Sequence, residues 1–151
     1  MITENDIAYM REALAEARLT ALDDEVPVGA VMVRDGEIIA RAHNTRERDK
    51  NPLSHAEIKI INDTSRALGG WRLTRCTLYV TLEPCPMCAG AIINSRIERV
   101  VYGAYDDKAG ALGTMIDLTE YPLFSPEIER GVLKDECASL LTEFFKAKRS
   151  K

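Results

Sequence analysis

The chain has 151 residues, of which 46% are hydrophobic and 29% are charged, and its formal net charge is −4 at pH 7. This length is typical of one domain, and we expect residues 1–151 to form a single domain. The composition excludes a disordered chain, collagen, a coiled coil and a small disulfide scaffold. The net charge argues against a general binder of polyanions but allows a local basic patch.

The sequence carries no sign of a membrane span or of secretion. No stretch approaches the roughly 18 consecutive apolar residues of a membrane helix. The N-terminal segment has acidic residues early and lacks the basic start and the apolar run of a signal peptide. We therefore predict a cytoplasmic protein with no membrane partner. In that reducing compartment the cysteines are expected to be thiols or metal ligands. They are Cys76, Cys85, Cys88 and Cys137.

The N-terminal part predicts a helix followed by a hairpin. Apolar residues recur there at nearly helical spacing: Ile7, Met10, Leu14, Ala17 and Leu22. Thr3 followed by Asp6 fits a capping box at the start of this helix. A Val-rich strand over 28–34 and a returning strand over 37–42 are joined by Asp35-Gly36, which is a strong hairpin signal.

The middle of the chain predicts a loop and then a helix, a strand and a second helix. Segment 41–52 is rich in charge and has no periodic apolar face, so it is predicted to be a loop. A helix over 56–68 ends at Gly69-Gly70. The alternating segment 76–82 is a strand, and Pro86 suits the first position of a helix that runs to about residue 95.

The remaining elements complete an α/β pattern. A short strand over 99–102 is closed by Gly103, and segment 106–122 is a connection with a short helix near Met115. Segment 133–148 is a helix that carries Leu140, Leu141, Phe144 and Phe145. The order α-β-β-α-β-α-β-α predicts a three-layer α/β domain with a mixed sheet.

A metal site is indicated by His55 together with the pair Cys85 and Cys88. Cysteines three positions apart can direct both thiols to one point across the first turn of a helix. A catalytic zinc takes three protein ligands of nitrogen and sulfur and keeps a fourth position for water. One histidine and two cysteines would therefore leave such a site open for chemistry.

Glu57 is predicted to be the proton shuttle of this site. It lies two residues after His55, need not be a ligand, and can reach a water held at the open position. Zinc lowers the pKa of a bound water from about 15.7 to near 7, which gives a nucleophile at neutral pH. A closed structural zinc site is the alternative, with Cys76, Cys137 or His43 as the fourth ligand. We interpret both of these cysteines as core residues and His43 as a surface or loop residue.

The combination H-x-E and P-C-x-x-C is the signature of zinc-dependent nucleoside deaminases. Over nearly its whole length the chain resembles the bacterial tRNA-specific adenosine deaminases, which belong to the zinc-dependent cytidine/deoxycytidylate deaminase superfamily. The resemblance rests on Glu25–Ala30, Asn44, His55–Ile58, Cys76–Cys85, Met87–Ala91, Ser95–Ile97, Arg99–Ala104 and Asp135–Ala138. Two departures, at Ser54 and Tyr105, concern the fit of the substrate and not the zinc chemistry.

The resemblance implies a three-layer α/β/α cytidine-deaminase-like domain with a central mixed sheet of about five strands. It implies hydrolytic deamination of the wobble adenosine in a tRNA anticodon loop to inosine, with release of ammonia. One zinc ion per subunit would be held by His55, Cys85 and Cys88, and Glu57 would move protons. Asn44 would contact the base, Asp106 would contact the RNA near it, and Ala56 would also bind substrate.

The same resemblance implies a homodimer that holds the anticodon loop across both subunits; no DNA partner is expected. Basic residues that could contact phosphates are Arg41, Arg46, Arg48, Lys50, Arg72, Arg75, Lys146, Lys148, Arg149 and Lys151. Solvated surface charge is the alternative, since Glu47 and Asp49 lie within the first group. Asn44 could also be a turn former, and Asp106 with Asp107 a solvated turn.

Two other functions stay open on the sequence. One is a deaminase of a free base or nucleotide, such as guanine or cytosine compounds, that uses the same four residues. The other is a non-catalytic, zinc-stabilised RNA-binding module. Glu57 argues against such a module, because a structural zinc site has no need of a carboxylate at that position.

Overall fold

The computed structural model describes residues 1–149, so Lys151 of the predicted basic C-terminus lies outside the described residues. Within this range one sheet has the strand order β2-β1-β3-β4-β5. The strands are β1 (Gly29–Arg34), β2 (Glu37–His43), β3 (Cys76–Leu82), β4 (Arg99–Ala104) and β5 (Glu127–Arg130). The helices are α1 (Glu4–Arg18), α2 (Arg46–Asp49), α3 (Ala56–Leu68), α4 (Pro86–Asn94) and α5 (Lys134–Arg149), with 3-10 turns η1 (Leu19–Asp23) and η2 (Leu118–Glu120).

The sheet is mixed, as predicted. Strand β1 pairs antiparallel with β2 and with β3, whereas β4 lies parallel to β3 and to β5. The predicted hairpin joins β1 to β2, and Asp35 and Gly36 both have positive φ, at 53° and 77°. Two such residues form the tight turn that suits the twist of a hairpin. Parallel strands need a crossover, and α4 supplies it between β3 and β4.

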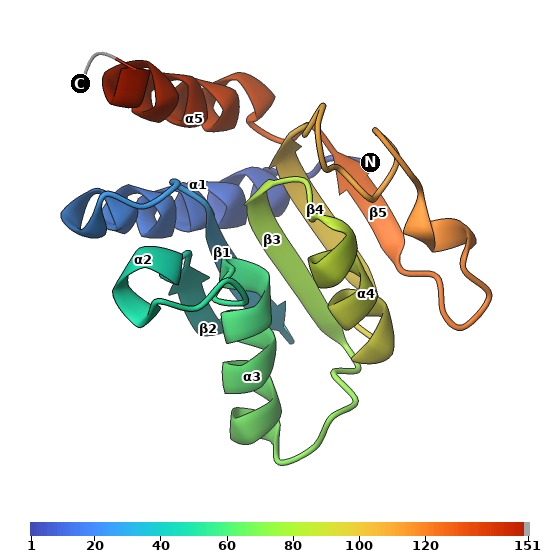
Figure 1. Ribbon diagram of the computed structural model, residues 1–151. Coiled ribbons are helices and arrows are strands. Elements are labelled where there is room, and N and C mark those ends of the chain that lie inside the picture. The colour runs from blue at the N-terminus through green and yellow to red at the C-terminus, as the bar shows by residue number, and fades with distance from the viewer. Residues whose placement is uncertain (150–151) are drawn as a thin grey trace.

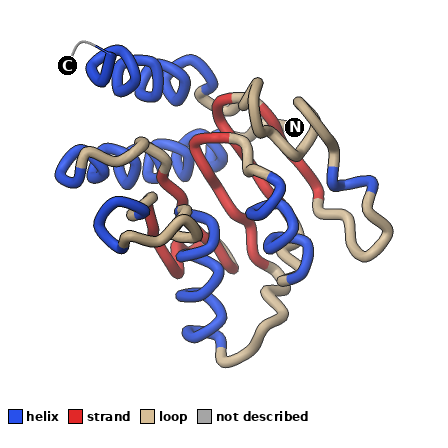
Figure 2. Tube along the Cα trace, viewed as in Figure 1, coloured by secondary structure: helices blue, strands red, loops and turns tan. Residues whose placement is uncertain are grey.

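Helices cover both faces of the sheet, so the predicted three layers are confirmed (Figures 1 and 2). On one face α3 and α4 pack against Leu78 and Val80 of β3. On the other face α1 and α5 pack against Tyr79 of β3 and Val101 of β4. Successive residues of β3 therefore enter opposite cores, as expected for a strand that is buried on both faces.

Two strand predictions need correction. Strand β4 continues through Gly103 to Ala104, which pairs with Leu82. A Cβ atom at residue 103 would lie 2.4 Å from Sγ of Cys137, so glycine allows α5 to approach the strand and does not end it. Strand β5 was not among the strands predicted from the pattern, because this short edge strand has Ile128 as its only apolar residue.

Segment 41–52 is not wholly a loop. Strand β2 extends to His43, and the short helix α2 follows it. The buried carboxylate of Glu25 accepts hydrogen bonds from the Glu47 backbone N–H and from the Arg46 guanidinium. The helix is therefore held by a residue about twenty positions away, which the local charge pattern does not reveal.

The predicted capping box of Thr3 and Asp6 is confirmed at the start of α1. That helix ends at Arg18, however, and Leu22 is 81% exposed in the following 3-10 turn instead of lying on the buried face. The short helix expected near Met115 is also misplaced, since a 3-10 turn lies over Leu118–Glu120. Within residues 1–149 no helix combines the length and the apolar character that crossing a membrane requires.

Candidate functional site

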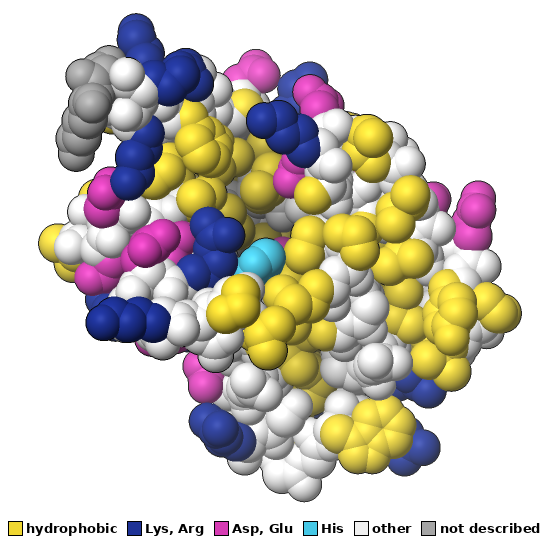
Figure 3. All heavy atoms as spheres, viewed as in Figure 1, with side chains coloured by type: hydrophobic (Ala, Val, Ile, Leu, Met, Phe, Trp, Pro, Cys, Tyr) yellow, Lys and Arg dark blue, Asp and Glu magenta, His cyan; other side chains and the backbone are white. Residues whose placement is uncertain are grey.

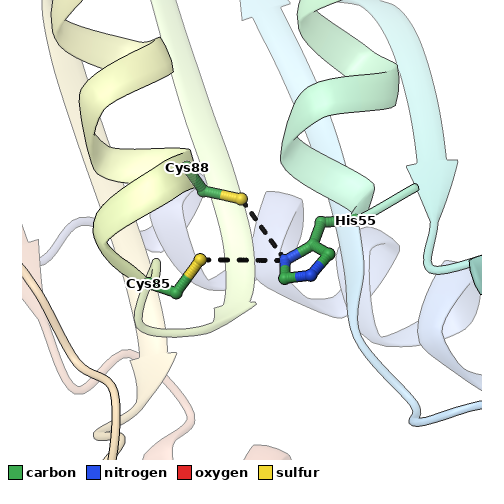
Figure 4. A group of neighbouring side chains, drawn as sticks. All are labelled: His55, Cys85 and Cys88. Carbon is green, nitrogen blue, oxygen red and sulfur yellow. Dashed lines mark hydrogen bonds between the residues drawn. The ribbon is translucent and has the colours of Figure 1, made fainter. Parts of the chain in front are cut away.

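His55, Cys85 and Cys88 lie together at the N-terminal ends of α3 and α4, two helices that contact each other (Figure 4). His55 is the N-cap of α3 and Cys85 is the N-cap of α4, and both have extended backbones. Pro86 is the first residue of α4, as predicted, and Cys88 lies in the same first turn, three positions after Cys85. Two helix starts on the same face of the sheet thus bring together residues that are 30 positions apart.

The distances between the donor atoms fit a tetrahedral metal ion. Nδ1 of His55 lies 3.8 Å from Sγ of Cys85 and 3.5 Å from Sγ of Cys88. The three donor atoms all lie within 4.8 Å of one another. Zinc–ligand bonds of about 2.3 Å to sulfur and 2.05 Å to nitrogen, set at a tetrahedral angle, would separate N and S by about 3.6 Å. The donor set and its spacing therefore suit zinc.

Of the three donors, Cys85 is the one whose environment favours the form that a metal ligand needs, the thiolate. Hydrogen bonds from Cys88 and, against the opposing effect of burial, from His55 lower the pKa of Cys85 to about 4. The hydrogen bond with Cys85 raises the pKa of His55. The pKa of Cys88 is raised by the hydrogen bond between Cys88 and Cys85 and by burial. One thiolate is thus already favoured, and a bound cation is what would favour the second.

The carboxylate of Glu57 lies in the first turn of α3, beside the cluster. The residue is 4% exposed and lines the cavity in front of the three donors. Burial raises the pKa of Glu57 to about 7. A carboxyl group with such a pKa can both accept and donate a proton near neutral pH. Its position therefore suits the transfer of protons to and from a bound molecule.

The cluster opens into a cavity of about 600 Å³, and Figure 3 shows a hollow in this face of the molecule. Besides Glu57 and the metal donors, the sequence predicts three more site residues: Asn44, Ala56 and Asp106. Asn44 and Asp106 line the cavity. Sequence reasoning missed the contribution of α5, which supplies Leu141, Thr142 and Phe145 to the lining.

Asn44 connects the cavity to the start of α3. Its Oδ1 atom accepts a hydrogen bond of 2.8 Å from the backbone N–H of Ala56, and both residues are buried. The N–H of Ala56 is therefore engaged by Asn44. Because this bond occupies Oδ1, the amide NH₂ group is the part of Asn44 that can meet an acceptor on a ligand. The predicted roles of Asn44 and Ala56 in binding substrate stay predictions.

Asp106 forms a turn shortly after the end of strand β4. Its Oδ1 atom accepts hydrogen bonds from the backbone N–H groups of Lys108 and Ala109. This arrangement is the turn that the sequence left open as an alternative. The same residue lines the cavity, so a role toward RNA stays a prediction beside its role in the turn.

The alternative fourth ligands of a closed zinc site lie elsewhere in the described chain. Cys76 is buried at the start of β3 and Cys137 is buried in α5, which confirms their interpretation as core residues. His43 is not a loop residue, because it ends β2 and its Nδ1 atom lies 3.1 Å from Oε1 of Glu16. Within residues 1–149 the group of side chains that could hold a metal ion consists of His55, Cys85 and Cys88, called the metal cluster below.

Comparisons with known proteins identify relatives along the whole chain. A family model described as MafB19-like deaminase matches residues 4–149. The tRNA-specific adenosine deaminase of Bacillus subtilis (strain 168) is 51% identical over 148 residues, which cover 97% of this chain and 92% of that protein. A solved structure from a study of A-to-I editing by tRNA:A34 deaminases at the wobble position of transfer RNA is 43% identical, with a TM-score of 0.85. That match covers 89% of this chain and 99% of the other.

A guanine deaminase from Nitrosomonas europaea has a similar structure, with a TM-score of 0.80 and 23% identity over 95% of this chain and 85% of that one. At this level of identity the likeness shows the fold alone. The family model, by contrast, matches nearly the whole chain, and the Bacillus subtilis relative shares half of its residues. The chain therefore belongs to the deaminase family, and within it to the tRNA-specific adenosine deaminases.

Proposed function

We propose that this chain catalyses the hydrolytic deamination of the wobble adenosine in a tRNA anticodon loop to inosine, with release of ammonia. The observation that carries the proposal is the buried carboxylate of Glu57 beside three metal-ligating donors at one cavity. The names of the relatives supply the substrate class, and the site supplies a chemistry that fits it.

The metal of this proposal is one zinc ion per subunit, held by His55, Cys85 and Cys88. These residues offer the nitrogen and sulfur donors that zinc prefers, at separations that suit a tetrahedral ion. When bound, zinc would supply a water activated for attack on carbon at neutral pH. Three protein ligands leave room for that water, which a closed structural site would not.

Glu57 carries the protons of the reaction. Its carboxylate would accept one proton from the attacking water and deliver it to the ring nitrogen of adenine. It would then accept the second proton from the hydroxyl formed at C6 and pass it to the leaving amine, which departs as ammonia. A buried group next to the reacting atoms exchanges protons without competition from bulk water. A non-catalytic RNA-binding module would have no use for this buried carboxylate inside a cavity.

The cavity suits a base taken out of an unpaired loop. Anticodon-loop bases can be splayed away from their neighbours, and a pocket can then read the base edge. The NH₂ group of Asn44 would donate to an acceptor on the base edge, and Asp106 would contact the RNA near it. Ala56 does not line the cavity, and its N–H is bound by Asn44, so its part in binding would be to hold that side chain.

Basic side chains at the cavity suit the phosphates of the RNA. Arg46 lines the cavity, and the buried carboxylate of Glu25 lies 3.3 Å from its guanidinium and orients it. Lys108 also lines the cavity. Phosphate contacts of this kind fix the orientation of a nucleic acid without reading its sequence.

We also propose the homodimer that the resemblance implied. Leu53, Met115 and Ile116 are 53%, 58% and 48% exposed. Figure 3 shows hydrophobic side chains gathered over α4 and the start of α3, next to the hollow. A second copy of the chain would cover apolar surface there and would extend the RNA-binding face beside the cavity.

Glu57 gives the test of this function. The variants Glu57→Ala and Glu57→Gln should keep zinc and RNA affinity, because the three donors and the phosphate contacts are untouched. Inosine formation in an adenosine-wobble stem-loop should fall by about 10⁴-fold or more, since one carboxylate serves several proton transfers. Zinc content, RNA affinity and inosine yield are measured on the same preparations.

The exposed Glu98 provides a matched control. Glu98→Gln makes the same change of side chain away from the cavity and should deaminate at the rate of the unmodified chain. Unchanged inosine formation in either Glu57 variant would contradict the shuttle role. Loss of zinc in both would show instead that Glu57 is a ligand.

A further inference from the structure

Glu83 is a buried carboxylate that the proposed reaction does not use. It follows β3 directly, is 2% exposed and stands two residues before Cys85. Its Oε1 atom accepts hydrogen bonds from the backbone N–H of Asp106 and from the hydroxyl of Thr114. Its Oε2 atom accepts from the backbone N–H groups of Leu112 and Thr114. One carboxylate therefore binds four donors that all belong to segment 106–114.

These bonds close segment 106–114 on itself. Its first residue, Asp106, and its last, Thr114, bind the same carboxylate oxygen, so both ends of the segment are held at one point. Gly110 lies against that point, where a Cβ atom would come within 2.5 Å of the Glu83 carboxylate. From the outer side, the guanidinium of Arg130 donates two hydrogen bonds to the carbonyl of Leu112.

The held segment is one wall of the cavity. Tyr105, Asp106, Asp107, Lys108 and Ala109 are consecutive, and all five line the cavity. The residues after Glu83 connect this wall to the metal cluster. The carbonyl of Pro84 accepts a hydrogen bond from the N–H of Ala111, and the next residue is Cys85. Glu83 thus fixes the position of this wall relative to the metal-ligating residues.

We propose that Glu83 is a positioning residue, which holds the wall 105–109 in the shape that binds the RNA substrate; this rests on the proposed function. The wall contains none of the three metal donors. A wall that has lost its anchor would have to be ordered when the substrate binds, and that cost weakens binding. Loss of the anchor therefore raises KM, while the metal cluster and Glu57 keep kcat close to its normal value.

Two variants and a matched control test this role. Glu83→Gln keeps the shape of the side chain but places an NH₂ group against donors. Thr114→Val removes one hydroxyl donor to Glu83. Thr119→Val is the control, because Thr119 is also half-buried and its hydroxyl donates to Asp117 instead. KM, kcat and zinc content are measured with the stem-loop substrate and the zinc-loaded protein.

Glu83→Gln should raise KM by about tenfold or more, as expected when hydrogen bonds to a charged group are lost. Thr114→Val should raise KM less, Thr119→Val should leave it unchanged, and kcat and zinc content should stay close to those of the unmodified chain. Thr114→Val decides the matter if Glu83→Gln does not fold. An unchanged KM in Thr114→Val and in a folded Glu83→Gln variant would overturn the proposal.

A fall in kcat or in zinc content with an unchanged KM would also overturn it, because Glu83 would then serve the metal cluster. Equal effects of Thr114→Val and Thr119→Val would show a general loosening of the segment, not an anchor at Glu83. If the unmodified chain forms no inosine in the stem-loop, the proposed function itself is wrong. An active unmodified chain with unaltered variants contradicts only the role of Glu83.

Discussion

The donors of the metal cluster owe their arrangement to two helix caps. A residue at an N-cap has an extended backbone, so its side chain leaves the chain just before the helix begins. His55 and Cys85 both occupy an N-cap position. Among the described residues, neither side chain accepts a capping hydrogen bond from its own helix. The positive ends of both helices also favour thiolates at this point.

Metal analysis tests this assignment residue by residue. Cys85→Ala and Cys88→Ala should each lose zinc, because two remaining ligands hold the ion poorly. Cys76→Ala and Cys137→Ala are the matched controls and should keep one zinc per chain, since both cysteines are buried in the core. Loss of zinc in either control would contradict the three-ligand cluster.

Spacing within one helical turn predicts which side chains lie together, whereas His55, Asn44 and Asp106 are assigned by the motif and by the resemblance. Cys85 and Cys88 meet the predicted geometry because three positions nearly complete a turn. Leu141 and Phe145 could not be assigned to the cavity in this way. Their i, i+4 spacing indicates only an apolar helix face, and the fold alone decides that this face meets the cavity.

Helix α1 is joined to the sheet by an ion pair between the buried Asp6 and the half-buried Arg99. The carboxylate of Asp6 accepts two hydrogen bonds from the Arg99 guanidinium, at 2.8 and 3.0 Å, and one from the hydroxyl of Tyr79. The same carboxylate closes the capping box with Thr3. One side chain therefore both starts the helix and fixes it to β3 and β4.

Removing this charge should destabilise the fold. Asp6→Asn keeps the shape but leaves Arg99 with Glu127, 3.4 Å away and largely exposed, as its charged partner. The loss of hydrogen bonds to a charged group should lower the free energy of unfolding by about 2 kcal/mol. Asp63→Asn, at an exposed position of α3, is the control and should change it little. Urea unfolding at pH 7 measures both. Equal stability of the two variants would show that the ion pair does not hold α1.

The same pair predicts a dependence on pH. Burial alone would raise the pKa of Asp6, but the hydrogen bonds from Arg99 and Tyr79 outweigh it and hold that pKa well below its usual range. Stability from a lowered carboxyl pKa is complete above the unfolded value of about 3.9 and is lost as the pH falls below it. The stability difference between the unmodified chain and Asp6→Asn should therefore shrink between pH 5 and pH 3, as urea unfolding would measure. A constant difference would contradict this origin.

Some elements could be predicted from the sequence to the residue and others could not. Helix α3 and strand β3 have the predicted bounds, because apolar periodicity and terminal glycines mark them. Helix α2 and strand β5 carry mostly charged residues, and partners elsewhere in the chain hold them: Glu25 for α2 and β4 for β5. Local sequence patterns do not reveal contacts with residues that are distant in the chain.

At the scale of the whole molecule, the sheet brings distant parts of the chain to one cavity. The residues that line it come from β3, α2, α3 and α5, from the segment before β1 and from the connections after β2, β3 and β4. The net charge of −4 does not exclude RNA, because Arg46 and Lys108 are placed at the cavity itself. We therefore expect this cavity to accept a base from an anticodon loop and not a free base.

A parallel assay of substrates distinguishes a base in an anticodon loop from a free base. The zinc-loaded chain is incubated with an adenosine-wobble anticodon stem-loop and, separately, with free adenosine, guanine and cytidine, and the products are identified by mass. We expect inosine in the stem-loop and no turnover of the free compounds, because contacts outside the base supply the orientation. Faster deamination of free guanine or cytidine than of the stem-loop would show that the cavity serves free bases or nucleosides instead.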